Sequence, residues 1–289
     1  GDPDALSNSA TGTNSAVEIQ TAMFQNLPTD INTLEANTDL TGGNAITADF
    51  NIWMNKELKI GGANDLELNG KITGYSIALN METDADTLIL SGTENQIGQI
   101  RLFRGTLEAG SNAALGNATI MGVKSSTLHY TGTGTFSNQL VLSELSTLTF
   151  DADNNLTLAS NVSGNGSLEL DGGNTFTVGN NLRHTGTTSV VNGTTLLFST
   201  NASIGSLGGD AASTINTGGN AITTGTNGFD STFSGTLAGG GSILKTGGGT
   251  WHLDTTDNSG WAGTLNVQQG FVDIGAGSVL DFNNVTLSG

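Results

Sequence analysis

The chain has 289 residues and contains no cysteine, only two prolines, and only eight lysines and arginines against 26 aspartates and glutamates. The lack of cysteine excludes disulfides, thiolate nucleophiles and sulfur-ligated zinc. The formal net charge of −18 repels phosphate backbones and anionic lipids, so nucleic acid is not an expected partner. No apolar run approaches the roughly 18 residues that a membrane-spanning helix needs. We therefore predict no transmembrane segment in this chain.

The abundant residues are small and polar. Gly (43), Thr (42), Asn (31) and Ser (25) make up about half of the chain. Gly weakens helices, and Thr, Asn and Ser bond to nearby backbone instead of extending a helix, so a helical protein is excluded. Disorder is also excluded, because 35% of the residues are hydrophobic and only 12% are charged. The composition therefore predicts an all-β fold with a buried core.

Apolar residues occur mainly as i, i+2 pairs, which is the period of a strand that buries one face. Aligning these pairs gives three columns, and each step along a column spans 20 residues, which is a repeat period. The spacing returns near the C-terminal end, and it is lost between about residues 198 and 240. The first column is Leu128/Tyr130, Leu148/Phe150, Leu168/Leu170 and Val190; the second is Leu156/Leu158, Phe176/Val178 and Leu196/Phe198; the third is Ile100/Leu102, Ile120, Leu140/Leu142, Val162 and Leu182; the late pairs are Leu265/Val267 and Val285/Leu287.

Three strand columns that repeat together do not suit a sandwich, where the strands run up and down. They suit a parallel β-helix with coils of about 20 residues, in which each coil lays its strands on those of the coil below. Leucine-rich repeats share the period, but their consensus pattern is missing. Tight corners between short strands also explain the Gly and Asn content. We predict this fold for residues 39–289.

The two ends are predicted to differ from the body. Residues 1–38 lack the coil pattern and hold both prolines, so we interpret them as an N-terminal cap, a linker or an assembly segment. At the other end the pattern still runs at Val285 and Leu287. An open strand edge there predicts a further coil, either from more sequence or from a neighbouring molecule.

Two segments resemble the autotransporter-associated β-strand repeat. One copy reads GTLAGGGSILKTGGGTWHL over 235–253 and continues as NSGWAGTLNVQQG over 258–270. A second reads VSGNGSLELDGGNTFTV over 162–178 and TGTTSVVNGTTLL over 185–197, with Leu170 in place of the usual lysine. The segment 105–116, GTLEAGSNAALG, is similar to one that commonly follows such repeats. The resemblance covers about residues 87–289.

The resemblance implies a right-handed β-helix of the kind found in bacterial autotransporter passengers. Such proteins are secreted or displayed at the cell surface, and many act as adhesins or stalks. The implied location is therefore extracellular, and the implied partners are a host or neighbouring cell surface, glycans, or copies of the chain itself.

Candidate chemistry rests on two pairs of carboxylates, Asp84 with Asp86 and Asp151 with Asp153. Their i, i+2 spacing points both side chains of a pair to one face of a strand. Such pairs can ligate calcium, or act as acid and base in polysaccharide cleavage. Ordinary solvent-facing acids remain the favoured interpretation. Calcium is therefore the one candidate cofactor, and no catalytic or cofactor-binding residue is assigned.

The histidines and tryptophans give weaker signals. His129, His184 and His252 fall on different predicted strands or turns, so they do not form a nucleophile triad, and we expect them at the surface. Trp251 and Trp261 flank one turn, while Trp53 stands alone. Core packing or a place at a coil end is favoured for the tryptophans over stacking on a sugar.

The sequence therefore predicts a non-enzymatic extracellular β-helix, a surface stalk or adhesin. A subunit that joins end to end into a filament or sheath is the alternative, suggested by the two ends. A polysaccharide lyase or hydrolase is the second alternative, suggested by the paired acids.

Overall fold

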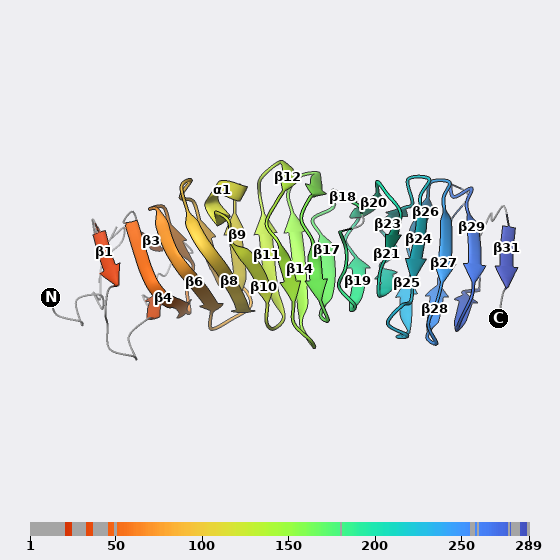
Figure 1. The fold of residues 1–289 in the computed structure, drawn as a ribbon, viewed down its shortest axis with the longest axis horizontal. Helices are drawn as coiled ribbons and strands as arrows, with labels where there is room; N and C mark the ends of the chain where they lie inside the picture. The colour runs from red at the N-terminus through yellow and green to blue at the C-terminus, as the bar shows by residue number, and fades with distance from the viewer. Residues whose placement is uncertain are drawn as a thin grey trace.

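The computed structural model describes residues 21–24, 33–36, 46–48, 51–179, 181–254, 258, 260–276, 278 and 284–287. In these residues the chain forms an elongated parallel β-solenoid of about 11 turns, with the first strands at one end and the last at the other (Figure 1). The predicted all-β parallel β-helix with coils of about 20 residues is confirmed.

The strands stack into four sheets, which we call A to D. Sheet A holds β1 (Thr21–Phe24), β2 (Thr33–Ala36), β4 (Asn51–Gly62), β6 (Ile72–Asn80), β8 (Gln96–Arg104), β10 (Thr119–Gly122), β13 (Leu140–Leu142) and β16 (Val162–Gly164). Sheet B holds β3 (Ile46–Ala48), β5 (Leu66–Leu68), β7 (Thr87–Leu90), β9 (Thr106–Ala109), β11 (Ser126–Tyr130), β14 (Thr147–Ala152), β17 (Ser167–Asp171), β19 (Thr187–Val190), β22 (Ser206–Gly209), β25 (Ser231–Phe233), β28 (Thr250–Leu253) and β30 (Phe271–Ile274).

The other two sheets are shorter. Sheet C holds β12 (Gly134–Phe136), β15 (Leu156–Leu158), β18 (Thr175–Val178), β20 (Thr195–Phe198), β23 (Thr214–Asn216) and β26 (Thr236–Ala238). Sheet D holds β21 (Ala202–Ser203), β24 (Ala221–Thr224), β27 (Ser242–Lys245), β29 (Thr264–Val267) and β31 (Asn284–Leu287). A single turn of helix, α1 (Asn112–Leu115), lies between β9 and β10.

A central coil visits three sheets in turn, as β13, β14 and β15 do in sheets A, B and C. Most strands alternate buried and partly exposed residues, so every second side chain enters the axis of the solenoid. The rings of Tyr130, Phe136, Phe150 and Phe176 form an edge-to-face column there, with neighbouring centroids 4.8–6.5 Å apart. One continuous apolar core therefore joins the coils.

Much of the predicted register is confirmed. Leu148 pairs with Leu168, Leu156 pairs with Phe176, and Val162 pairs with Leu182. Two steps are wrong, because Leu128 pairs with Phe150 and not with Leu148, and Val162 pairs with Leu140 and not with Leu142. The connection between β13 and β14 is longer than the one before it, and it projects Leu145 outward at φ 61° with 97% of its surface exposed.

The 20-residue spacing is lost between about 198 and 240, as the sequence shows, but the coils continue there through β21 to β26. Coil length varies instead. The coil from Leu196 to its partner Ile215 is short, whereas the coil from Gly209 to its partner Phe233 is several residues longer. An alignment at one fixed period loses such coils because their corners differ in length.

The first and last described strands also pair in parallel with their neighbours. β1 and β2 fall within residues 1–38, and both pair with β4 in parallel. The assignment of 1–38 as a cap, linker or assembly segment stays a prediction. At the other end, Leu265 pairs with Val285, as the late repeat predicts.

The lysine of the repeat-like segment is a buried corner residue. Lys245 is 1% exposed, and its Nζ donates to the carbonyl oxygens of Thr246 at 2.7 Å and Gly247 at 3.0 Å. A Cβ on Gly225, which has φ 86°, would lie 3.0 Å from that Nζ. The corner therefore requires glycine where the ammonium group packs. Lys245 is in sheet D, whereas Leu170, its counterpart in the second copy, is in sheet B.

Candidate functional site

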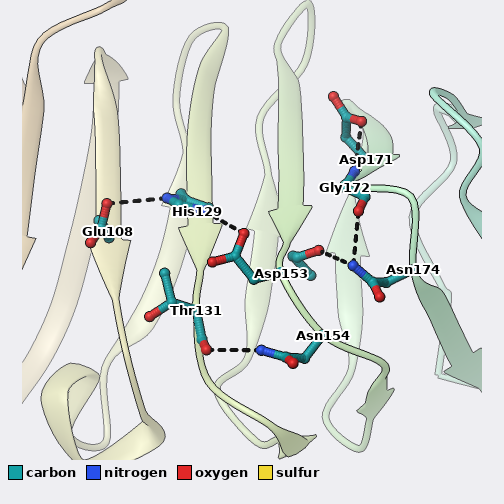
Figure 2. A network of polar contacts seen from close by, with 9 residues as sticks. Glu108, His129, Thr131, Asp153, Asn154, Asp171, Gly172 and Asn174 are labelled. Carbon is teal, nitrogen blue, oxygen red and sulfur yellow. Dashed lines mark hydrogen bonds and ion pairs between the residues drawn. The ribbon is translucent and has the colours of Figure 1, made fainter.

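A group of titratable side chains lies on the outer face of sheet B, around His129 in β11 (Figure 2). Its Nδ1 is 3.1 Å from Oε2 of Glu108 in β9, and its Nε2 is 3.2 Å from Oδ1 of Asp153, which follows β14. Both imidazole nitrogens therefore face a carboxylate. We call Glu108, His129, Asp151, Asp153 and Asp171 the His129 cluster.

Strand register assembles this cluster. His129 pairs with Glu108 on one side and Asp151 on the other, and Asp151 pairs with Asp171. Parallel in-register strands place such residues about 4.8 Å apart. The outward positions of four successive strands thus form one row of ionisable groups. Asp153, in the turn that follows β14, contacts His129 from the next coil.

The carboxylates control the charge of the histidine. Burial alone lowers the pKa of His129, but hydrogen bonds to Asp153 and Glu108 and the charges of Asp151 and Glu108 outweigh it, so the pKa is raised. The pKa of Asp151 is also raised, first by burial and then by the charges of Asp171 and Asp153, although His129 opposes this. The cluster therefore favours an imidazolium between carboxylates.

Asparagines hold the turns beside this row (Figure 2). The Nδ2 of Asn154 donates to the carbonyl oxygen of Thr131 at 3.1 Å. The Nδ2 of Asn174 donates to the carbonyl oxygens of Ala152 and Gly172, at 2.9 and 2.8 Å. These bonds tie each turn to the preceding coil and so fix the positions of Asp153 and Asp171.

The geometry limits what the His129 cluster can do. Because both ring nitrogens are engaged, neither has a lone pair free for a metal ion or a substrate proton. The arrangement is suited to holding and releasing one proton as the pH changes, with a change in the local charge.

The other predicted pair lies at a different place. Asp84 accepts from Nε of Arg104 at 3.0 Å, and Asp86 accepts from the backbone N–H of Thr83 at 2.8 Å. Asp84 also borders an open depression whose other lining residues come from successive coils: Gly105, Ser125, Ser126, Thr127, Thr147 and Thr149. The lining is mostly hydroxyl groups.

Calcium binding stays a prediction for Asp84, Asp86, Asp151 and Asp153. Asp151 and Asp153 share the His129 cluster, whereas Asp84 and Asp86 are engaged by Arg104 and Thr83. Within the described residues, no three His, Asp or Glu side chains converge as metal ligands do.

The expectation that all three histidines lie at the surface is wrong for His184. Its side chain is 2% exposed, its Nε2 is 3.1 Å from Oγ1 of Thr188, and burial lowers its pKa to about 4. The favoured core packing is confirmed for Trp251 and Trp261, both 1% exposed. Trp53 differs, with 48% of its surface exposed.

The sequence motifs give no role to Glu108 and place His129 only at the surface. A signal was available, because the ionisable residues of the row follow one another at close to the coil spacing: Glu108, His129, Asp151 and Asp171. Charged residues at the coil spacing predict a row on one outer face, just as apolar residues at that spacing predict the core.

No protein-family model, curated protein or solved structure matches this chain significantly. No helix in the described part of the chain has the length and apolar character needed to cross a membrane.

Proposed function

We propose that this chain is a non-enzymatic extracellular rod, a stalk or adhesin of the autotransporter-passenger type, which holds binding surfaces away from a bacterial cell. The observation that carries the proposal is the continuous sheet B, in which 12 strands from successive coils pair in one unbroken ladder. Such a ladder, backed by one apolar core, resists bending and spaces side chains regularly along its length.

The outer face of the rod supports an adhesive role. Along sheet B, Thr87, Thr106, Thr127 and Thr149 occupy paired, partly exposed positions on four successive strands. A row of hydroxyl groups at strand spacing offers repeated weak hydrogen bonds to an extended polar ligand. Many rods on one surface then act together, because linked weak sites gain effective concentration.

An oriented adhesion assay tests this proposal. The chain, biotinylated at its C-terminus, is coupled to streptavidin beads, and bead retention on epithelial cells and on immobilised glycans is measured under flow. A globular protein of similar charge is the control. We expect retention that rises steeply with rod density and that competing soluble chain reduces.

Three results contradict the proposal. The first is retention no higher than the control on every surface. The second is regular end-to-end fibres of the purified chain in electron micrographs, which favour the filament alternative. The third is release of reducing sugars from a panel of polysaccharides, if Asp84→Asn abolishes it, which favours an enzyme.

A further inference from the structure

Two large aromatic side chains stand exposed on the outer face of sheet A. Trp53 in β4 is 48% exposed and Tyr75 in β6 is 72% exposed. In the described part of the chain, the other two tryptophans and the other tyrosine are at most 1% exposed. Water contact at Trp53 and Tyr75 costs free energy that burial elsewhere avoids.

The strand pairing places these rings on neighbouring strands. Trp53 in β4 pairs with Thr73 in β6, and Tyr75 lies two residues beyond Thr73, where the register of β4 against β6 shifts between Met54 and Glu57. Both side chains are exposed, which places both on the outer face. One strand across and two residues along separate such positions by about 8 Å, close enough for large rings to form one surface. β4 and β6 lie side by side near the N-terminal end of the rod (Figure 1).

A glycine leaves one flank of Tyr75 uncovered. Gly98 in β8 falls at the register position opposite Tyr75, and a Cβ there would lie 2.8 Å from the carbonyl oxygen of Tyr75. Close backbone approach therefore excludes a side chain at this position, and this flank of Tyr75 stays bare.

The described side chains around the pair are polar. Asn51, Thr73 and Gln96 occupy outward positions beside the pair and offer amide and hydroxyl groups. Two ion pairs lie among these described side chains, Arg101 with Glu57 at 2.9 Å and Lys71 with Glu94 at 3.6 Å. An uncharged ligand with an apolar face and hydrogen-bonding edges fits this surface better than an anion or a cation does.

We propose that Trp53 and Tyr75 form a binding platform for a neutral glycan, whose pyranose rings stack their C–H faces on the two side chains. Rigid amphipathic rings provide contact area at low entropic cost, and the amide and hydroxyl groups beside them bind sugar hydroxyls. The occupant is a sugar chain because the β4–β6 and β6–β8 backbones are already paired, so a peptide strand finds no free edge. This inference rests on the proposed adhesive function and gives it a ligand class and a place.

Tryptophan fluorescence provides a direct test, because Trp53 is the only one of the three tryptophans that acrylamide can reach readily. Quenching is measured with cellohexaose, chitohexaose or mannohexaose at up to about 10 mM, which covers the millimolar affinities expected of weak sites. A heparin-derived hexasaccharide is the acidic comparison. Trp53→Phe identifies the signal, since this variant loses the quenchable component.

We expect at least one neutral hexasaccharide to protect Trp53 from acrylamide. Tyr75→Ala should weaken that protection at least about fivefold, as loss of one aromatic contact of about 1 kcal/mol implies. Tyr75→Phe should retain most of the protection, because the ring remains. Phe229→Ala, which removes a 65% exposed ring elsewhere, should leave it unchanged. Circular dichroism melts confirm that each variant is folded.

Protection by none of the neutral sugars, protection by the heparin fragment alone, or an unchanged affinity in Tyr75→Ala overturns the platform. The adhesion assay separates the two proposals. Sugar protection without bead retention supports the platform and refutes adhesion. The opposite result is that no sugar protects Trp53 in the unmodified chain, while beads carrying the double variant Trp53→Ala with Tyr75→Ala are still retained. That result supports adhesion and refutes the platform.

Discussion

Leu148 lies directly opposite Leu168 on neighbouring parallel strands, and both side chains are completely buried. The two residues are one repeat apart in the chain, so their pairing defines one full coil. The same pairing of residues one repeat apart recurs for Leu156 with Phe176 and for Leu265 with Val285. Stability therefore depends on contacts between coils, and a change in one coil affects its neighbours as well.

The aromatic column is the first place to test this dependence. Phe150→Ala should lower the free energy of unfolding by about 3–5 kcal/mol, because it leaves a cavity between Phe136 and Phe176. Chemical denaturation measures the loss. Phe229→Ala, at a 65% exposed ring, should change stability by less than about 0.5 kcal/mol. Equal losses in the two variants would contradict the assigned core.

The buried lysine gives a second prediction. Lys245→Met keeps most of the side-chain volume but leaves the carbonyl oxygens of Thr246 and Gly247 without their donor. We expect a loss of about 1–3 kcal/mol, the cost of unsatisfied buried acceptors. Lys124→Met, at an exposed position, is the matched control and should be nearly neutral. A stable Lys245→Met protein would show that the ammonium group is dispensable.

His129 should stabilise the fold more at low pH than at high pH. Its folded pKa is raised above the ordinary 6.5, so its contribution is full below about pH 6.5 and disappears as the pH rises through the folded pKa. The substitution His129→Gln should therefore lower the free energy of unfolding by about 1 kcal/mol at pH 5.5 and by less at pH 9. Urea denaturation at the two pH values measures the difference. His252→Gln, which loses a single contact to Asp273, is the control. A cost independent of pH would refute the ion pairs.

His184 should act in the opposite direction. Its folded pKa is lowered to about 4 from the ordinary 6.5, so the unfolded chain binds the proton first as the pH falls. Stability should drop by about 3 kcal/mol between pH 7 and pH 4 from this residue alone. His184→Gln should flatten that part of the pH profile. An equally steep acid loss in the variant would assign the effect to other groups.

The apolar pattern predicted the β-helix because burial imposes the coil period on the sequence. It failed where corners change length, as between Leu142 and Leu148, since a solvent-exposed turn tolerates extra residues without disturbing the core. The carboxylates Asp151 and Asp153 were identified as a pair, but their partner His129 was not. His129 pairs with Asp151 because the coil between them is longer than 20 residues, whereas the alignment assumed a constant coil length.

The absence of native cysteines allows the stacking to be tested by disulfide trapping. Thr149 and Glu169 are outward-facing, directly paired residues beside Leu148 and Leu168, and Ser189 pairs with Glu169 one coil further on. Thr149→Cys with Glu169→Cys should form a disulfide rapidly under mild oxidation, because strand spacing of about 4.8 Å lies within the range that the bond needs. Thr149→Cys with Ser189→Cys, two coils apart, should remain reduced. Rapid closure of the second pair, or failure of the first, would contradict the stacked-coil structure.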